Sequence, residues 1–287
     1  MSDVVRVEVA ADRVATVSLN RPDKLNAVSP DVFTGLAEAA QQVATDPEVR
    51  AVLIRGEGRA FCSGLDLASL QGMSSAEPRA SEGSAEPRAS EGSAEPRSGA
   101  QADGNGQAVP RDPQAGWRLW QEMDKPVVAA VQGYALGAGF QLALAADIRF
   151  AATDAVMSVF EITYGLVPDL GGTQFLPPIV GPAKAKELIW TAKRLNAEEA
   201  LALGIVNRVV ELAQLETEAR AFAADLASRP PMPIGFTKKI VNSSGKHSLE
   251  EGMRQEITAQ MKCIGSNDMR EAVSAAFEKR QGSYTGT

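Results

Sequence analysis

QGYALGAGFQLALAAD (132–147) is the segment on which the fold of this chain depends. Gly137, Ala138 and Gly139 open a strongly apolar helix, so the first N–H groups of that helix have no partner within it. An anion or a developing oxyanion is stabilised at such a helix end, and small residues allow a ligand to approach the backbone. The same residues would also permit tight helix packing. The segment is not a dinucleotide fingerprint, because Leu142 replaces the third glycine.

The rest of the first two thirds alternates between strand and helix patterns. Residues 4–9 and 13–19 predict two strands, 30–45 predict a helix that begins with Ser-Pro, and 51–56 predict a buried strand. The segment IRFAA (148–152) predicts a further strand. This alternation indicates an α/β domain.

The last third is mostly helical in its pattern. Helices are predicted at 172–190, 197–203, 211–228, 234–243, 248–263 and 267–280. We therefore divide the chain into an α/β core, residues 1–195, and a C-terminal helical region, residues 196–287. Apolar residues of the last two helices, such as Ile257 and Phe277, can pack on the core or on a neighbouring subunit, and the sequence does not decide between these.

A short repeat interrupts the core. SAEPRASEG at 75–83 recurs at 84–92, and a third copy begins at Ser93. The repeat has no large apolar side chain whose burial would offset the entropy of ordering. We therefore expect a low-complexity, disordered insert at about 74–112.

The composition excludes several classes of protein. The chain has 287 residues, 44% of them hydrophobic, and a formal net charge of -7, so a basic surface for nucleic acid is not expected. It has neither a run of 18 uncharged apolar residues nor a signal-peptide pattern, so no membrane span is expected. Cys62 and Cys263 form neither a disulfide framework nor a zinc-binding spacing. Two reduced cysteines fit a cytoplasmic protein.

Two further segments carry candidate chemistry. RAFCSGLDL (59–67) follows a predicted strand across a glycine turn and can expose backbone N–H groups to a carbonyl oxygen, although a tight turn is an equal alternative. In VMSVFEITYGLVPDLGGTQFLP (156–177), Glu161 is the sole charge in an apolar stretch. Burial there would raise its pKa, as is typical of a general acid or base. Asp169 is either a second acid or the cap of a helix beginning near Gly172.

Taken together, these segments resemble the crotonase (enoyl-CoA hydratase/isomerase) superfamily. NRPDKLNA (20–27) and AFEKR (276–280) extend the resemblance over nearly the whole chain outside the repeat. It implies a ClpP/crotonase spiral of ββα units with a C-terminal helical trimerisation region, assembled as a homotrimer or as a hexamer of two trimers. It also implies an acyl-CoA substrate, with no metal and no cofactor beyond the coenzyme A of the substrate.

The resemblance also implies roles for individual residues. The N–H groups of Leu65 and Ala138 would form an oxyanion hole, and Lys279 would reach a phosphate of coenzyme A, often from a neighbouring subunit. The implied substrate- and CoA-binding residues are Lys24, Leu25, Cys62, Ser63, Gly64, Leu65, Asp66, Leu67, Gly137, Ala138, Phe160, Tyr164 and Lys279.

The sequence departs from the hydratase pattern at one catalytic position. Hydratases of the family carry two glutamates, and the matching positions are Gln141 and Glu161. An amide does not exchange a proton near neutral pH, whereas a double-bond isomerase can use one carboxylate. Asp169 matches a second acid of dienoyl-CoA isomerases, but those enzymes also keep an acid at the position of Gln141. The expected function is thus a hydratase or isomerase of fatty-acid or related acyl-CoA metabolism, or else an acyl-CoA-binding scaffold with little turnover.

Overall fold

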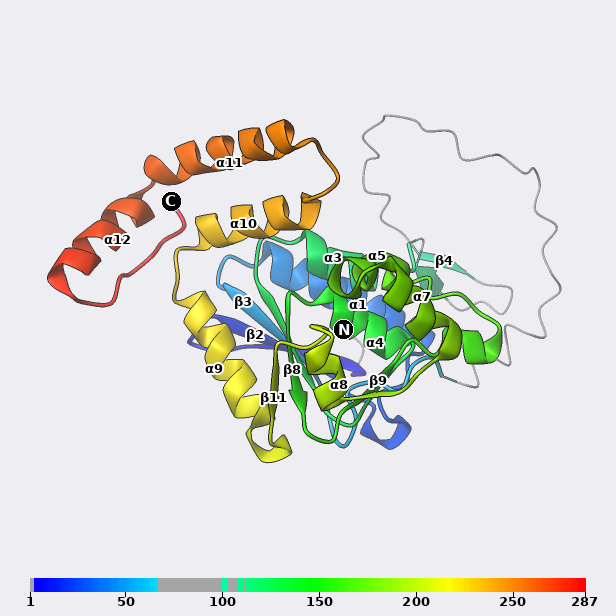
Figure 1. The fold of residues 1–287 in the computed structure, drawn as a ribbon. Coiled ribbons are helices and arrows are strands. Elements are labelled where there is room, and N and C mark those ends of the chain that lie inside the picture. The colour runs from blue at the N-terminus through cyan, green and yellow to red at the C-terminus, as the bar shows by residue number, and fades with distance from the viewer. Residues whose placement is uncertain (1–2, 67–99, 103–107, 111) are drawn as a thin grey trace.

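A mainly parallel sheet forms the centre of the fold (Figure 1). The computed structural model describes residues 3–66, 100–102, 108–110 and 112–287. Within these ranges the main sheet has the strand order β1 (Val5–Val9), β2 (Val14–Leu19), β3 (Ala51–Gly56), β6 (Val127–Val131), β8 (Ile148–Ala152) and β11 (Arg208–Val210). Strand β1 is antiparallel to β2, and the other neighbours are parallel. The predicted α/β class is therefore confirmed.

Both faces of this sheet are covered by helices, as parallel sheets require. On one face, Val52 and Ile54 of β3 pack in one cluster with α1 (Pro30–Thr45), α3 (Ala115–Glu122) and α4 (Ala138–Ala145). On the other face, Ala51 and Leu53 pack in a second cluster with α9 (Leu215–Ala227). Successive side chains of a strand point to opposite faces, which explains why the first four residues of β3 are all apolar and buried.

A smaller sheet lies beside the main one and carries the loops of the site. It has the order β10 (Leu195–Asn196), β9 (Val156–Ser158) and β7 (Tyr134–Leu136). The predicted helix 172–190 is wrong as a single element. It consists of α5 (Gly172–Phe175), α6 (Pro177–Val180) and α7 (Pro182–Thr191), because Pro177 and Pro182 each remove a helix hydrogen bond.

Part of the predicted insert has secondary structure. Strands β4 (Ala100–Ala102) and β5 (Ala108–Pro110) pair antiparallel inside the range 74–112, so the expectation of disorder is wrong for these residues. Backbone pairing of this kind does not require large apolar side chains. The repeat itself lies outside the described residues, and its disorder stays a prediction.

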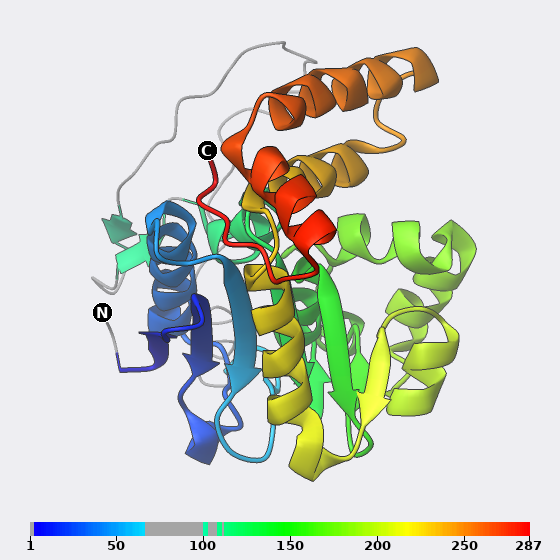
Figure 2. The same cartoon turned by 90° about the vertical axis from the view of Figure 1, so that its left-hand side faces the viewer.

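The predicted domain boundary at residue 195 is placed too early. Strand β11 belongs to the main sheet, and α9 packs on that sheet after α8 (Ala197–Ala202). The helices that extend from the core begin with α10 (Pro231–Ser243) and continue with α11 (Leu249–Ile264) and α12 (Asn267–Glu278) (Figures 1 and 2). A strand of three residues within a helical pattern is too short for periodicity to reveal.

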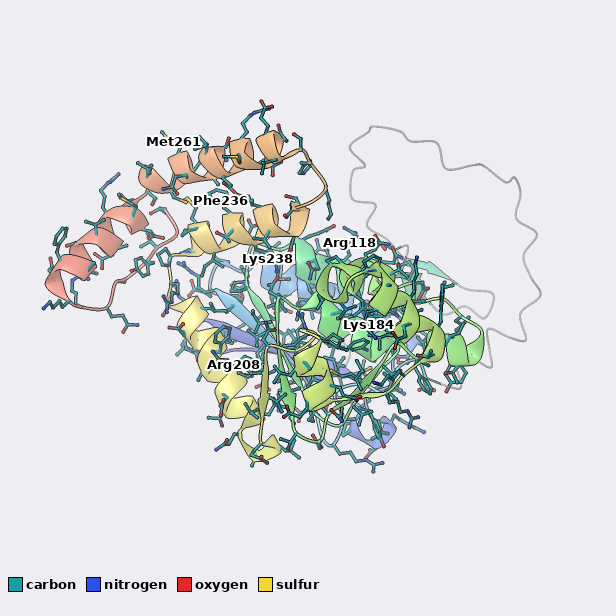
Figure 3. All side chains as sticks on the ribbon, viewed as in Figure 1. Arg118, Lys184, Arg208, Phe236, Lys238 and Met261 are labelled. Carbon is teal, nitrogen blue, oxygen red and sulfur yellow. The ribbon has the colours of Figure 1, made fainter. Side chains whose placement is uncertain are left out.

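The last two helices expose large apolar side chains instead of packing them on their own core. Helix α10 separates α11 from the sheet, as Figure 3 shows for Met261 and Phe236. The exposed residues include Leu249, Met253, Ile257, Met261, Val273 and Phe277. Of the two alternatives left open by the sequence, packing on the core of the same chain is therefore wrong. No helix in the described part of the chain is long and apolar enough to cross a membrane.

Candidate active site

A cavity of about 430 Å³ opens beside the N-terminus of α4. Its walls come from the loop after β3, from the junction of β7 with α4, and from the loop after β9. The predicted residues that line it are Lys24, Ser63, Gly64, Leu65, Asp66, Gly137, Ala138, Phe160, Glu161 and Tyr164. These three segments, far apart in the sequence, thus line one cavity, together with Lys24 from the segment after β2.

Two backbone N–H groups face this cavity without a partner in the described part of the protein. Val28 donates its N–H to the carbonyl of Gly64, and Asp66 donates to the carbonyl of Val28, which leaves the N–H of Leu65 pointing the other way. Ala138 is the first residue of α4, where an N–H has no acceptor within the helix. Both residues line the cavity.

The two glycines beside Ala138 are needed for different structural reasons. Gly137 has φ 50° and ψ -120°, which disfavours any residue with a side chain, and a Cβ there would lie 3.1 Å from Oε1 of Glu161. A Cβ at Gly139 would lie 2.3 Å from the carbonyl oxygen of Cys62. The packing alternative is therefore realised at Gly139, while the helix end at Ala138 stays open to the cavity.

Gln141 and Glu161 are in direct contact. The Nε2 of Gln141 donates to Oε1 of Glu161 over 2.6 Å. The Oε1 of Gln141 accepts the N–H groups of Leu170 and Gly172, at 2.9 and 2.8 Å. Because two backbone donors occupy the amide oxygen, the NH₂ group must face Glu161, and the orientation of the amide is fixed by the network.

Glu161 is a buried carboxyl group with a raised pKa. Its side chain lies at the start of the 3-10 helix η2 (Glu161–Tyr164) and is 6% exposed. Burial raises its pKa above the ordinary value of 4.5, the charge of Asp169 adds to this, and the hydrogen bond from Gln141 opposes it. Its Oε2 is the sole buried side-chain oxygen or nitrogen among the described residues that has no hydrogen-bond partner. One carboxylate oxygen is therefore held and the other is free.

Asp169 does not join these residues. Its side chain is exposed and does not line the cavity, although its charge acts on Glu161. The predicted cap is also wrong, since Gly171 is the N-cap of α5 and no side chain caps it. The carbonyl of Asp169 accepts a hydrogen bond from Gln114 at 2.6 Å.

Four other predicted residues lie away from the cavity lining or outside the described residues. Cys62 is fully buried, and burial raises the pKa of its thiol to about 12, so it packs and does not react. Leu25 acts through its backbone, because its carbonyl accepts the N–H of Ser63 at 3.0 Å. Lys279 ends α12, away from the cavity of its own chain. Leu67 is outside the described residues.

The cavity also has residues that the sequence did not suggest, namely Ala27, Leu136, Leu166 and Arg194. Arg194 places its guanidinium 5.3 Å from the ring centre of Phe160, a cation–π contact. No motif of the sequence marks this arginine, which lies between α7 and β10. Ala27 and Leu136 belong to segments quoted in the sequence analysis, but nothing in the sequence marks either residue as part of a cavity wall.

The fold and the site can now be compared with known proteins. The sequence model of the enoyl-CoA hydratase/isomerase family matches residues 10–89 and 98–287. The chain belongs to this family. The resemblance to the crotonase superfamily is confirmed, and the chain is an enzyme of the hydratase/isomerase type.

Relatives in this family carry both reaction names. Over 274 residues the chain is 32% identical to a crotonyl-CoA hydratase of Syntrophomonas wolfei, with 95% of each chain covered. It is 34% identical to the peroxisomal Delta(3,5)-Delta(2,4)-dienoyl-CoA isomerase of Arabidopsis thaliana, covering 92% of this chain and 89% of that one. An enoyl-CoA hydratase structure from Bacillus anthracis superposes with a TM-score of 0.82 at 30% identity, covering 99% of this chain and 100% of that one.

Proposed function

We propose that this family member is an enoyl-CoA double-bond isomerase in which Glu161 alone moves the proton. The observation that carries the proposal is the contact of Gln141 with Glu161. In that contact an amide occupies the place of a second carboxylate, while Oε2 of Glu161 stays free.

The proposed reaction starts from a 3-enoyl thioester. The thioester oxygen lies between the N–H groups of Leu65 and Ala138, and the Glu161 carboxylate takes a proton from the α-carbon. The electrons move to the thioester oxygen and form a dienolate, which the two donors stabilise. The protonated Glu161 then delivers the proton to the γ-carbon, and a 2-enoyl thioester is released. The same group acts as base and then as acid, so no second titratable group is needed.

Hydration makes a different demand on the site. Water must be deprotonated as its oxygen bonds to the β-carbon, and a proton must reach the α-carbon. Gln141 cannot supply either proton transfer, because its amide neither gains nor loses a proton near neutral pH. Both of its polar atoms are also engaged, with Glu161 and with two backbone N–H groups.

The test is a comparison of substrates with the purified protein. We expect 3-hexenoyl-CoA to gain the absorbance of a conjugated thioester, and crotonyl-CoA to lose that absorbance at least about a hundredfold more slowly. Hydration of crotonyl-CoA at a comparable rate would contradict the proposal. Binding of both thioesters without turnover of either would favour an acyl-CoA-binding scaffold.

The pH dependence of the isomerase is expected to report Glu161. The base must be ionised, and burial raises its pKa above 4.5. We therefore expect kcat/KM to decline with a slope of one as the pH falls through that raised pKa, at a pH clearly above the ordinary glutamate value. An acidic limb at or below 4.5 would show that Glu161 is not the titrating base.

Replacing Gln141 with glutamate is expected to create or raise hydratase activity. The N–H groups of Leu170 and Gly172 would hold an oxygen of the new carboxylate and favour its charged form. Glu161, which has a raised pKa, would then keep its proton beside it and act as the acid. We expect hydration of crotonyl-CoA to rise by at least about tenfold in the absorbance assay. Intact folding without any gain would mean that pocket shape sets the reaction.

We also propose that the chain assembles as a homotrimer or as two such trimers. The apolar side chains exposed on α11 and α12 support this, since a chain in solution seldom leaves so many uncovered. Such an assembly would bring Lys279 of one subunit towards the cavity of another, where its ammonium would bind a phosphate of coenzyme A.

A further inference from the structure

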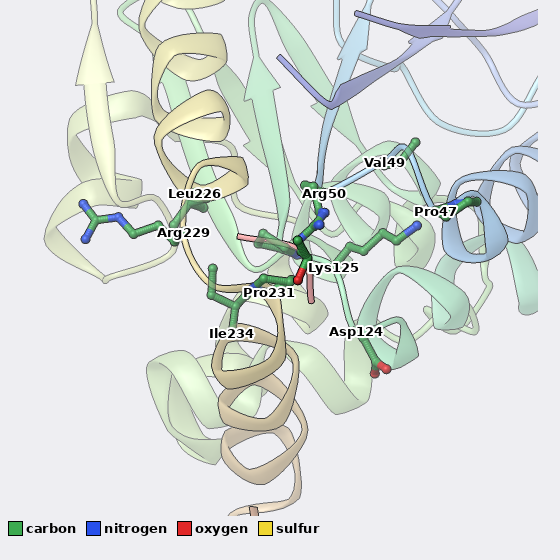
Figure 4. Close-up of a pocket in the computed structure, with 11 residues that line it drawn as sticks. Pro47, Val49, Arg50, Asp124, Lys125, Leu226, Arg229, Pro231 and Ile234 are labelled. Carbon is green, nitrogen blue, oxygen red and sulfur yellow. The ribbon is translucent and has the colours of Figure 1, made fainter. Parts of the chain in front are cut away.

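A second cavity, of about 200 Å³, lies at the opposite end of the strands from the active site (Figure 4). Arg50 and Lys125 line it directly before β3 and β6, whereas the active site follows these strands. The junction of α9 with α10 supplies a second wall, and Thr285 of the C-terminal tail supplies a third. The core, the helical region and the tail thus meet at one place.

The C-terminal tail, residues 279–287, is held at this cavity by α12 and by the core. Asp268, 3% exposed at the start of α12, accepts the N–H groups of Thr285 and Gly286 at 2.7 and 2.8 Å. From the core, Nη2 of Arg50 donates to the carbonyl of Tyr284 over 3.3 Å. The docked tail therefore forms part of the wall of the cavity.

The lining of this cavity carries three cationic side chains and one carboxylate. Asp124, the sole acidic residue of its lining, pairs with Lys239, and Arg229 pairs with Asp225. Arg50 forms no direct ion pair with a carboxylate in the described ranges, although the charges of Asp268 and Glu48 act on it. Its long bond to Tyr284 is its sole side-chain hydrogen bond there and uses one of five donors.

The surroundings of Arg50 strengthen the effect of its charge. Three of the lining residues are prolines, which offer no N–H group and form apolar walls. Apolar walls concentrate the field of a cation that they enclose. The ammonium of Lys125 adds to the positive charge, although it also donates to the carbonyls of Val43 and Asp46.

We propose that this cavity binds a small oxyanion, a phosphate or a carboxylate group, through the guanidinium of Arg50. The planar fork of an arginine matches both groups and can bind either through two parallel hydrogen bonds. A volume of about 200 Å³ holds such an ion with a few waters, at about 30 Å³ for each water. Because the tail closes the cavity, the bound anion stabilises the docking of the tail and of α12 on the core.

The test is the melting temperature of the full chain, without substrate, in increasing sodium phosphate or sodium acetate balanced with sodium chloride to constant ionic strength. Arg50→Gln removes the guanidinium that is proposed to bind the anion. Arg254→Gln makes the same change of charge on the exposed face of α11 and serves as the matched control. Any general effect of phosphate on stability acts on all three proteins alike.

At ten times its dissociation constant, the anion should raise the Tm of the parent and of Arg254→Gln by roughly 2–4 °C more than that of Arg50→Gln. The anion that produces this saturable rise identifies the ligand as phosphate or carboxylate. An equal rise in parent and Arg50→Gln, or no saturable rise with either anion, overturns the proposal. If Arg50→Gln does not fold, Arg50→Lys keeps the charge without the fork and should need about tenfold more anion for half the shift. If Arg50→Lys needs the same anion concentration as the parent for half the shift, the proposal is also overturned.

Discussion

Replacing Glu161 with glutamine is expected to lower isomerase turnover by roughly 10²–10⁴, the usual contribution of a positioned general base. Glutamine keeps the size of the side chain and can still hydrogen-bond Gln141, but it cannot carry the proton. Affinity for the acyl-CoA is expected to change little, because the backbone donors of Leu65 and Ala138 are untouched. The measurement is kcat and KM for 3-hexenoyl-CoA, with Glu38→Gln on the exposed side of α1 as the matched control.

The same variant has a predictable effect on stability. Burial raises the pKa of Glu161, so the folded protein binds this proton more tightly than the unfolded chain does. The free energy of unfolding therefore decreases as the pH rises from about 4.5 through the raised pKa, and it is constant above that range. Glutamine has no such loss, so Glu161→Gln should be at least as stable as the parent at pH 7. If the variant unfolds instead, the carboxylate of Glu161 has a structural role. If it turns over at the parent rate, a group other than Glu161 moves the proton.

Replacing Gly137 with alanine is expected to lower kcat/KM for 3-hexenoyl-CoA by about 10², because displacements near 1 Å at a reacting centre can cost that much. The new Cβ would lie 3.1 Å from Oε1 of Glu161, and alanine at φ 50° is strained. Both the carboxylate and the N–H of Ala138, the next residue, would move. The strain itself costs about 1–3 kcal/mol and should lower the melting temperature by several degrees.

Gly252→Ala is the matched control for this substitution. Gly252 lies in α11, where a Cβ meets no atom within 4 Å. Alanine there should leave activity unchanged and slightly stabilise the helix. Parent-like activity of Gly137→Ala would show that the site tolerates a displaced Glu161 and Ala138, and would remove the argument for a preorganised pair.

Local patterns were sufficient to predict most of the core. The helix 30–45 and the strand 51–56 have the predicted bounds, since an apolar periodicity and a proline start mark the first and the apolar run 51–54 marks the second. The burial of Glu161 also followed from its apolar neighbours. Strands of two or three residues, such as β10 and β11, were missed because their pairing depends on distant segments.

The contacts at the site were beyond local pattern. That Gln141 touches Glu161, and that Leu170 and Gly172 donate to its oxygen, depends on α4, η2 and α5 meeting in three dimensions. The exposure of Asp169 depends on the same packing. Arg194 could not be assigned at all, because a lone arginine after a helix is usually solvated.

The pair of N–H groups that binds the side-chain oxygen of Gln141 has an evolutionary consequence. Two N–H groups can donate to the oxygen of an amide or of a carboxylate, so glutamine and glutamate can fill the same space. The codons of these two amino acids differ at a single nucleotide. One point mutation can therefore exchange a site with one carboxylate for a site with two in a protein of this fold. Overall sequence similarity is then a poor guide to the reaction that a given family member catalyses.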